Sequence, residues 1–556
     1  MKLVSILSFY LLSTFSTLYG KGDNKIITHS FDRAEQQYTA MLKALPEPTA
    51  YPRTTDNNGK LRTTPLNDWT EGFYPGSLWY IYENNKQNTW KQEAIRWTEA
   101  LEPLKKQKGH HDIGFLIYCS FGNAYRLTKK EEYKQIIAPV EITAVEGSMN
   151  KLQIRNYYDF LNLDTTTLYW EVKAEDQTIQ DGTVEELSVA PHEGKIIALP
   201  ITAFELQENT DYYLNLTVCQ KEERNYAPAG YEIKKVQIPM QIRKDGFSVR
   251  ETADKLQVTE GQGGLTVENS RVTAKFSTVF GKLISFGKDG KEYLTDGPRM
   301  NVYRATIDND MYKKEDWMNK YFIQKPVEET EYVSCLKEDD KVIVRIGTFF
   351  SCYNQSWGFE CDYTYTVYSC GQMKVEIQGK AVQRGKLEPA FLPRIGVIMK
   401  GNKNFQKTMW YGMGPGESYV DSKAASIMGI YENTVDGMMT DYVFPQENGH
   451  HEQVKWFRIG DGKDGLLCKM EEKLGLNLAN YTDESLEKAQ HPFEIEKADD
   501  VIIHLDYRQS GLGSNSCGEE QLEENKVKLQ DFAMAFTVQA AECGTEIRKA
   551  RKQYID

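Results

Sequence analysis

The spacing of apolar residues changes between residues 128 and 140, and this change constrains the fold more than any other feature. Before it, apolar residues recur at helical spacing, as in SFDRAEQQYTAMLKAL, where they fall at Phe31, Ala34, Tyr38, Met41 and Leu45. After it, they occupy every second position, as at Leu168, Trp170 and Val172, which predicts strands. One domain cannot follow both periods, so the sequence predicts a helical part followed by β-sheet parts.

The chain has 556 residues, of which 40% are apolar, enough for about three or four domains of ordinary size. We predict a multidomain, mainly β protein. A short α-helical part spans 30–137, and an all-β module with the strand spacing of an immunoglobulin-like sandwich spans 138–242. A larger β-sandwich occupies 255–538, and 539–556 form a basic tail. Within the large β region, MEEKLGLNLANYTDESLEKAQH (470–491) is interpreted as a helical or loop insertion.

Residues 1–20 have the composition of a secretory signal peptide. Lys2 precedes an apolar run that reaches Leu18, and Gly20 offers a small residue for cleavage. No later segment approaches the roughly 18 uninterrupted apolar residues that a membrane-spanning helix needs. We therefore predict a periplasmic or secreted protein that does not have a membrane as its partner.

Charge and residue usage argue against several classes of partner. The net charge of -13, from 80 acidic and 67 basic residues, would repel a nucleic-acid backbone. Nine cysteines include no C-x-x-C pair, and the only neighbouring histidines are His110-His111 and His450-His451, so we predict no metal, no cofactor and no disulfide framework. The 33 Tyr, 23 Phe and 9 Trp residues suit the stacking of sugars and the packing of β-sheet cores equally.

Two motifs lie in the helical part: DWTEGFYPG (68–76) and HDIGF (111–115). Together they resemble unsaturated glucuronyl hydrolases, glycoside hydrolase family 88, over about 32–137. The resemblance implies part of a six-hairpin α/α barrel and places Asp112 at one of two catalytic aspartates. The family's second aspartate comes from later helices, which β-type sequence replaces here, so Asp112 is a catalytic remnant. The alternative interpretation makes Asp112 the N-cap of a helix that begins at Ile113.

Five further motifs follow in order: NVYRATIDND (301–310), FLPRIGV (391–397), WYGMGPGESYVDSK (410–423), YVFPQENGHHEQVKW (442–456) and QSGLGSNSCG (509–518). They resemble the C-terminal domains of glycoside hydrolase family 2 β-galactosidases over about 140–538. This resemblance implies an immunoglobulin-like domain and a large sandwich related to galactose mutarotase. From their chemistry, we predict a buried ion pair between Arg304 and an aspartate such as Asp310, and a loop that satisfies Glu447 and Asn448 internally.

The resemblance implies retaining galactoside hydrolysis by two glutamates about 5 Å apart on a (β/α)8 barrel. The sequence has no W-N-E segment and no alternating pattern for that barrel, so the family's catalytic residues map to no position here. The resemblance also implies that the loop 511–518 reaches the substrate, with Asn515, Cys517 and Gly518 as candidate positions. The alternative is a glycine-rich turn between strands.

Three hypotheses follow for the whole chain. It is a β-galactosidase-type fragment, inactive alone, that works with a barrel-bearing partner chain or as a homo-oligomer. It is a non-catalytic secreted protein that binds a carbohydrate, either a galactoside or a uronide-containing glycan. It is a fusion, by gene rearrangement or by an assembly join, because both resemblances stop within LTKKEEYKQIIAPVEI (127–142).

Overall fold

A computed structural model describes residues 24–56, 60–64, 66, 68, 70–106, 116–128, 140–158, 160–207, 210–224, 228–242, 254–516 and 520–542. The predicted signal peptide and the candidate residues Asp112, Cys517 and Gly518 lie outside the described residues. The chain divides into two compact units. The first contains Met1–Val172, Ile179–Phe204 and Leu214–Met240, and the second contains Lys173–Thr178, Glu205–Tyr213 and Gln241–Asp556.

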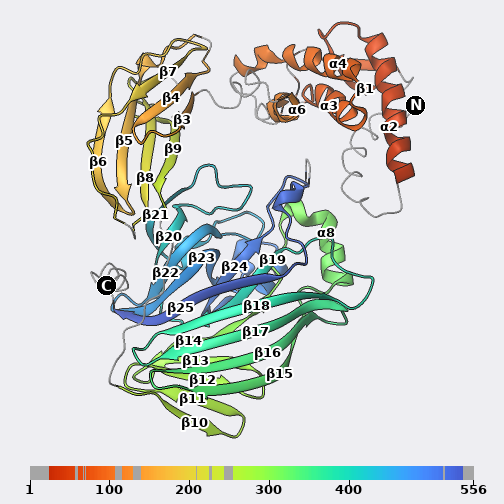
Figure 1. The fold of residues 1–556 in the computed structure, drawn as a ribbon. Helices are drawn as coiled ribbons and strands as arrows, with labels where there is room; N and C mark the ends of the chain where they lie inside the picture. Colours follow the sequence, from red (N-terminus) through yellow and green to blue (C-terminus); the bar gives the residue numbers. More distant parts are fainter. Residues whose placement is uncertain are drawn as a thin grey trace. The chain divides into compact units, whose positions relative to one another are not determined.

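The N-terminal part is helical, as predicted, with a small hairpin inserted (Figure 1). Its elements are α2 (Asn24–Ala44), β1 (Tyr51–Thr55), β2 (Leu61–Thr64), α3 (Phe73–Asn85), α4 (Asn88–Glu99) and α6 (Asn123–Thr128). Helices α3 and α4 form a tight pair because Lys86 takes a left-handed conformation, with φ of 57°, directly after α3. Fully buried Trp79 and Trp97 belong to the apolar cluster at the centre of this part.

The glycines of the GFYPG motif have a packing function in this helical part. A Cβ atom at Gly72 would lie 2.4 Å from the carbonyl oxygen of Leu116, and one at Gly76 would lie 2.7 Å from that of Cys119. Both glycines therefore permit the close approach of α3 to the segment that leads into α6. Trp79, three residues after this motif, is fully buried and donates from Nε1 to Thr98 Oγ1 at 2.9 Å, so it is a core residue.

Two small sheets form the predicted immunoglobulin-like module (Figure 1). One has the order β3-β4-β7 and the other β6-β5-β8-β9. The strands are β3 (Val140–Ala144), β4 (Lys151–Asn156), β5 (Thr166–Ala174), β6 (Gln177–Val184), β7 (Gly194–Ala198), β8 (Tyr212–Gln220) and β9 (Glu232–Gln241). The predicted alternation is confirmed, because Leu168, Trp170 and Val172 of β5 are all buried in the core of this module.

A 16-stranded sheet forms the large β-sandwich. Its main path is β10-β11-β12-β13-β14-β19-β24-β23-β25-β18-β17-β16-β15, and β20, β21 and β22 branch from β23. In chain order the strands are β10 (Gln257–Gly261), β11 (Gly264–Glu268), β12 (Thr273–Ser277), β13 (Lys282–Lys288), β14 (Lys291–Asn301), β15 (Pro326–Lys337), β16 (Lys341–Cys352), β17 (Trp357–Tyr368), β18 (Met373–Gln383), β19 (Arg394–Gly401), β20 (Lys407–Gly414), β21 (Ile427–Thr434), β22 (His451–Gly460), β23 (Asp464–Tyr481), β24 (Lys497–Gln509) and β25 (Phe532–Glu542). Two short helices are α8 (Met311–Glu315) and α9 (Asp483–Lys488).

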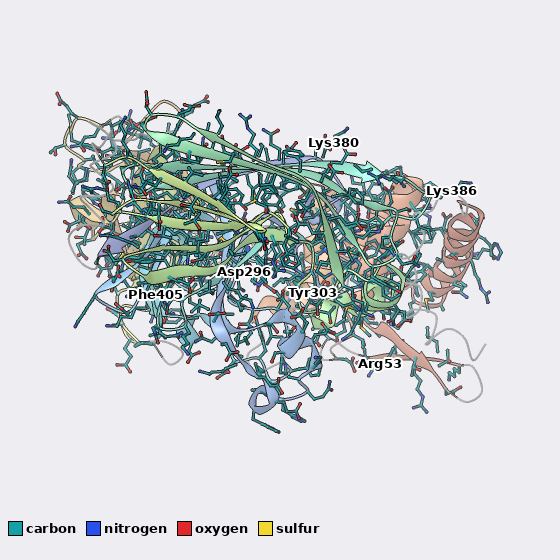
Figure 2. All side chains as sticks on the ribbon, turned by 90° about the horizontal axis from the view of Figure 1, so that it is seen from below. Arg53, Asp296, Tyr303, Lys380, Lys386 and Phe405 are labelled. Carbon is teal, nitrogen blue, oxygen red and sulfur yellow. The ribbon has the colours of Figure 1, made fainter. Side chains whose placement is uncertain are left out.

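The sheet folds over onto itself and encloses one apolar core. Phe276 of β12 packs edge-on against Tyr365 of β17 at 5.2 Å between ring centres, although these strands are far apart in the sheet order. The backbone N–H of Met300 on β14 likewise donates to Tyr363 Oη on β17 at 3.2 Å. Figure 2 shows how side chains fill the space between the strands, with the fully buried Phe405 labelled. The mainly β, multidomain fold class is thus confirmed.

Two predicted boundaries are corrected. Residues 470–491 are not an insertion: most of the segment lies in β23, which ends at Tyr481, and only α9 is helical. Strand β25 continues to Glu542, past residue 538, where we placed the end of the sandwich. In the part of the chain that the structure describes, no helix is long and apolar enough to cross a membrane.

Candidate functional site

The central strands of the large sandwich have one apolar face and one buried polar face. Alternation along a strand sends Val397 of β19, Leu505 of β24 and Leu476 of β23 into the apolar core. On the opposite side of the same strands and of β14, five polar side chains are at most 8% exposed. We call this surface the polar face; its strand residues are Asn301, Arg394, Asn477, His504 and Asp506.

Loops that contain the predicted motifs cover the polar face and add further buried charges. Arg304 donates from Nη2 to both carboxylate oxygens of Asp310 at 3.2 Å, and from Nη1 to the carbonyl of Ser510 at 2.8 Å. Both side chains of this pair are buried, which confirms the predicted ion pair. Burial raises the pKa of the Asp310 carboxyl, although the Arg304 guanidinium beside it acts in the opposite direction.

Arg394 is the central cation of the polar face. It donates from Nη2 to Glu447 Oε2 at 2.6 Å, and its Nη1 lies 3.5 Å from Asp506 Oδ2. Glu447 also accepts from Gln509 Nε2 at 3.1 Å. Arg394 belongs to β19 and Gln509 to β24, so neighbouring strands satisfy this carboxylate, and the prediction that its own loop does so is wrong for Glu447. Burial by itself lowers the pKa of Arg394, but the carboxylates of Asp506 and Glu447 outweigh it and raise that pKa above its ordinary value. Asn448 is satisfied too, because its side chain accepts from the N–H of Thr440 at 3.1 Å.

Asp506 and His450 meet at the edge of the polar face. His450 Nδ1 lies 2.9 Å from the carbonyl oxygen of Ser418, so we assign the ring proton to Nδ1 and leave Nε2 as an acceptor. Burial lowers the pKa of His450 to about 3 and raises the pKa of the Asp506 carboxyl to about 7. The 3.7 Å approach of His450 Nε2 to Asp506 Oδ2 is therefore not an ion pair at neutral pH.

The loop 510–516 lies over the polar face. Asp421 accepts from the backbone N–H groups of Leu512 and Gly513, both at 2.9 Å. Asn309 donates to the carbonyl of Gly513 at 2.8 Å and accepts from Ser516 Oγ at the same distance. Two motifs far apart in sequence therefore hold the loop of a third motif in one conformation.

Asn515 is the one loop candidate that lies among the described residues. Its side chain is 5% exposed, and its Nδ2 has no hydrogen-bond partner in the described part of the chain. Asn515 is thus buried, and its predicted contact with substrate stays a prediction. The sequence analysis placed Asp421 and Asn309 in two of the motifs but did not indicate that either side chain binds this loop.

Glu417 fixes a second loop over the polar face. It accepts from Tyr442 Oη, from Thr440 Oγ1 at 3.0 Å and from the N–H of Gly449 at 2.8 Å. Gly449 has a positive φ of 72°, and a Cβ atom there would lie 2.6 Å from the carbonyl oxygen of Met438. The GESYVDS and PQENGHH motifs thus act as scaffold for the polar face.

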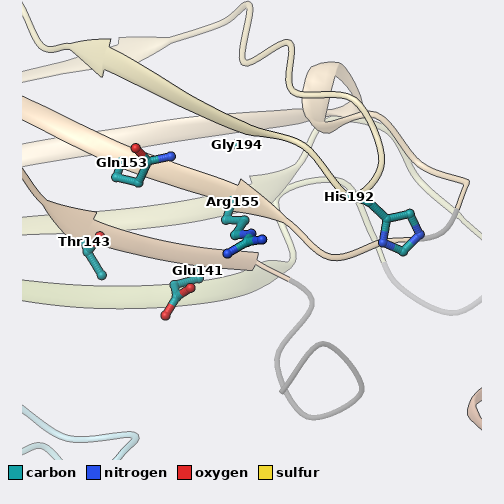
Figure 3. A pocket seen from close by; sticks show the side chains of 6 residues that line it. All are labelled: Glu141, Thr143, Gln153, Arg155, His192 and Gly194. Carbon is teal, nitrogen blue, oxygen red and sulfur yellow. The ribbon is translucent and has the colours of Figure 1, made fainter. Parts of the chain in front are cut away.

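A separate pocket of about 330 Å³ lies on the β3-β4-β7 sheet (Figure 3). Its lining is polar: Glu141, Thr143, Gln153, Arg155, His192 and Gly194. Four of these residues are exposed, and Glu141 already accepts from Tyr157 Oη at 2.8 Å. This pocket is a depression in a solvated surface. We therefore place the candidate functional site on the polar face.

The polar face suits hydrogen bonding rather than metal binding. Among the described residues, no group of three or more His, Cys, Asp or Glu side chains could hold a metal ion. The cations of the face are the guanidinium groups of Arg304 and Arg394, each engaged with a carboxylate. The remaining acceptors and the supported loop can bind a polar, uncharged ligand.

Comparisons with known proteins show which proteins the chain resembles. The chain is a relative of glycoside hydrolases. More particularly, residues 152–241 match the model of β-galactosidase domain 4, and residues 268–538 match the model of the β-galactosidase small chain. The predicted resemblance of the C-terminal region to β-galactosidases is therefore confirmed.

Two curated relatives each match 73% of this chain. The β-galactosidase of Priestia megaterium is 28% identical over 413 residues, which cover 73% of this chain and 39% of that protein. The β-galactosidase of Kluyveromyces lactis is 26% identical over 411 residues, with 73% and 37% covered. The chain thus spans about two fifths of the length of these relatives.

Two solved structures are similar to parts of the chain. An unsaturated glucuronyl hydrolase specific for heparin is 40% identical over a segment that covers 19% of this chain and 27% of that one, with a TM-score of 0.17. The galactose 1-epimerase of Lactobacillus acidophilus is 9% identical, covers 52% of this chain and 100% of its own, and has a TM-score of 0.31. The fold described above rests on strand pairing and not on these superpositions.

Proposed function

We propose that this chain is the accessory portion of a β-galactosidase-type glycoside hydrolase. In this proposal, a (β/α)8 domain on a separate polypeptide carries the catalytic glutamates, and the β-sandwich contributes the loop 510–516 to the galactoside site. The observation that carries the proposal is the convergence of motifs on that loop. Asp421 and Asn309 come from different motifs, and both bind its backbone directly.

The charge pairs of the polar face favour a positioning role for the sandwich. Most of the buried charges on the polar face are arranged in compensated pairs, such as Arg304 with Asp310 and Arg394 with Glu447. Such pairs fix the conformation of the loops that cover them. A loop held in this way can contact a sugar with little loss of conformational entropy on binding.

A complementation assay tests the proposal. The purified chain is mixed with a polypeptide that carries a β-galactosidase barrel but lacks the sandwich, and hydrolysis of a nitrophenyl β-galactoside is followed. We expect hydrolysis only in the mixture, and a lower kcat/KM when the chain carries Asp421→Ala. Asp499→Asn, at an exposed position of β24, is the matched control and should leave the rate unchanged. Equal rates for the barrel polypeptide with and without this chain would reject the proposal.

We also propose that the chain acts outside the cytoplasm. The support is the composition of residues 1–20, in which a lysine precedes an apolar run and a small residue ends it. Mass spectrometry of the protein recovered from the periplasm or medium should find an N-terminus near residue 21. Recovery of the uncleaved chain from the cytoplasm alone would contradict this.

A further inference from the structure

A pocket of about 200 Å³ opens at the edge of the polar face, between β23 and β24. Its inner wall contains His450, Gly475, Asp506 and Gln509, and its outer wall includes charged residues such as Glu452 and Lys473. The pocket is distinct from the loop 510–516, to which we assigned the contribution to galactoside hydrolysis.

The inner wall presents acceptors whose hydrogen bonding is incomplete, although Asp506 Oδ2 lies 3.5 Å from Nη1 of Arg394. His450 Nε2, both carboxylate oxygens of Asp506 and Gln509 Oε1 are buried and have no hydrogen-bond partner within the described residues. The three side chains are at most 6% exposed. Buried polar atoms are normally paired, so this concentration of orphan acceptors indicates a ligand that donates several hydrogen bonds.

Two glycines keep space around these acceptors. Strand pairing places Gly396 of β19 and Gly475 of β23 directly opposite Asp506, one on each side. A Cβ atom at Gly396 would lie 2.4 Å from Asp506 Oδ1, and one at Gly475 would lie 2.2 Å from His450 Nε2. Any side chain at either position would push into the acceptor cluster.

The residues of the inner wall favour a neutral ligand over an anion or a metal ion. An anion would meet the carboxylate of Asp506. A metal ion would find the Arg394 guanidinium 3.5 Å from Asp506 and, among the described residues, no metal-binding group. The volume lies below the roughly 300 Å³ at which sites for drug-sized ligands begin, so a single small ring is the appropriate size.

We propose that this pocket binds a neutral monosaccharide unit, whose hydroxyl groups donate to Asp506, His450 and Gln509. Binding needs neither a catalytic barrel nor hydrolysis, so the inference goes beyond the proposed function and can fail separately from it. The sandwich then holds a glycan at a second point, away from the bond that is cleaved.

Titration calorimetry of the full chain tests the inference with methyl β-galactoside, methyl β-glucoside and glucuronate as probes. We expect saturable binding of at least one neutral glycoside in the millimolar range. Asp506→Asn, which replaces an acceptor with a donor, should weaken that binding at least about tenfold. Asp499→Asn on the same strand is the matched control and should bind like the wild type. Heats without saturation for both neutral glycosides, or tighter binding of glucuronate, would overturn the proposal.

A second pair of variants keeps the test decisive if Asp506→Asn fails to fold, as circular dichroism would show. Gly475→Ala places a methyl group against His450 Nε2 and should abolish binding. Gly416→Ala adds the same methyl group where no atom lies within 4 Å, and should leave binding intact. Undiminished binding by folded Gly475→Ala would place the sugar elsewhere and overturn the assignment of the pocket.

Discussion

The replacement Asp506→Asn should stabilise the sandwich at alkaline pH and not at acidic pH. Asp506 is 1% exposed, and burial raises the pKa of its carboxyl from 3.8 to about 7, against the opposing effect of Arg394. A raised carboxyl pKa means that the folded state holds the proton more tightly than the unfolded state. Ionised Asp506 therefore destabilises the fold progressively as the pH rises from about 4, and the full penalty is reached above about 7.

The difference between these two pKa values corresponds to about 4 kcal/mol at pH 8 and to about 1 kcal/mol at pH 4.5. Asparagine has nearly the same shape and no charge, and Arg394 keeps its 2.6 Å hydrogen bond to Glu447 in the variant. The free energy of unfolding of Asp506→Asn should consequently exceed that of the wild type by up to about 4 kcal/mol at pH 8, with the gain shrinking toward zero as the pH falls.

Urea unfolding followed by tryptophan fluorescence, at several pH values between 4.5 and 8, measures this difference. The other buried titrating groups, such as Asp483 and His450, are present in both proteins, so their contributions largely cancel in the comparison. Asp499→Asn is exposed and should give no pH-dependent difference. A variant that is equally destabilised at pH 4.5 and pH 8 would contradict this prediction, because it would show that Asp506 stabilises the fold as a partner of Arg394.

Asp211→Asn should lower the free energy of unfolding, measured with urea, by about 3–5 kcal/mol, because Asp211 lies 2.8 Å from Lys455 Nζ and both side chains are buried. A loss below about 1 kcal/mol would contradict this. Asp421→Ala should speed amide hydrogen exchange at Gly513 with little change in global stability, and unchanged exchange would mean that the loop does not depend on Asp421. Thr482→Ala should cost about 1 kcal/mol, because the Thr482 side chain caps α9 by accepting from the N–H of Ser485 at 3.2 Å, and Thr482→Ser should restore most of it in the same unfolding assay.

The sequence predicted what depends on local pattern and on charge pairing. Alternation in β5 identified the buried residues Leu168, Trp170 and Val172, and the helical period identified α2. The proximity of Arg304 to acidic residues predicted a buried pair, since neither charge is stable alone in a protein interior. These inferences succeeded because partner groups lie within a few residues of one another.

The sequence could not show what depends on register between distant strands. LGLNLANY, at 474–481, was misread although Leu474, Leu476 and Leu478 alternate as in a strand, because the acidic residues on either side suggested a helical or loop insertion. The position of Asp506 between Gly396 and Gly475 follows from the pairing of β19, β24 and β23, which no local pattern encodes. The support of Gly513 by Asp421 likewise joins residues 92 positions apart.

The most direct test of the proposed function is the initial rate of nitrophenyl β-galactoside hydrolysis by this chain, alone and after mixing with a barrel-bearing polypeptide. We predict no turnover by the chain alone and a rate in the mixture well above that of the barrel polypeptide by itself. Turnover by the purified chain alone, or no gain on mixing, would contradict the account.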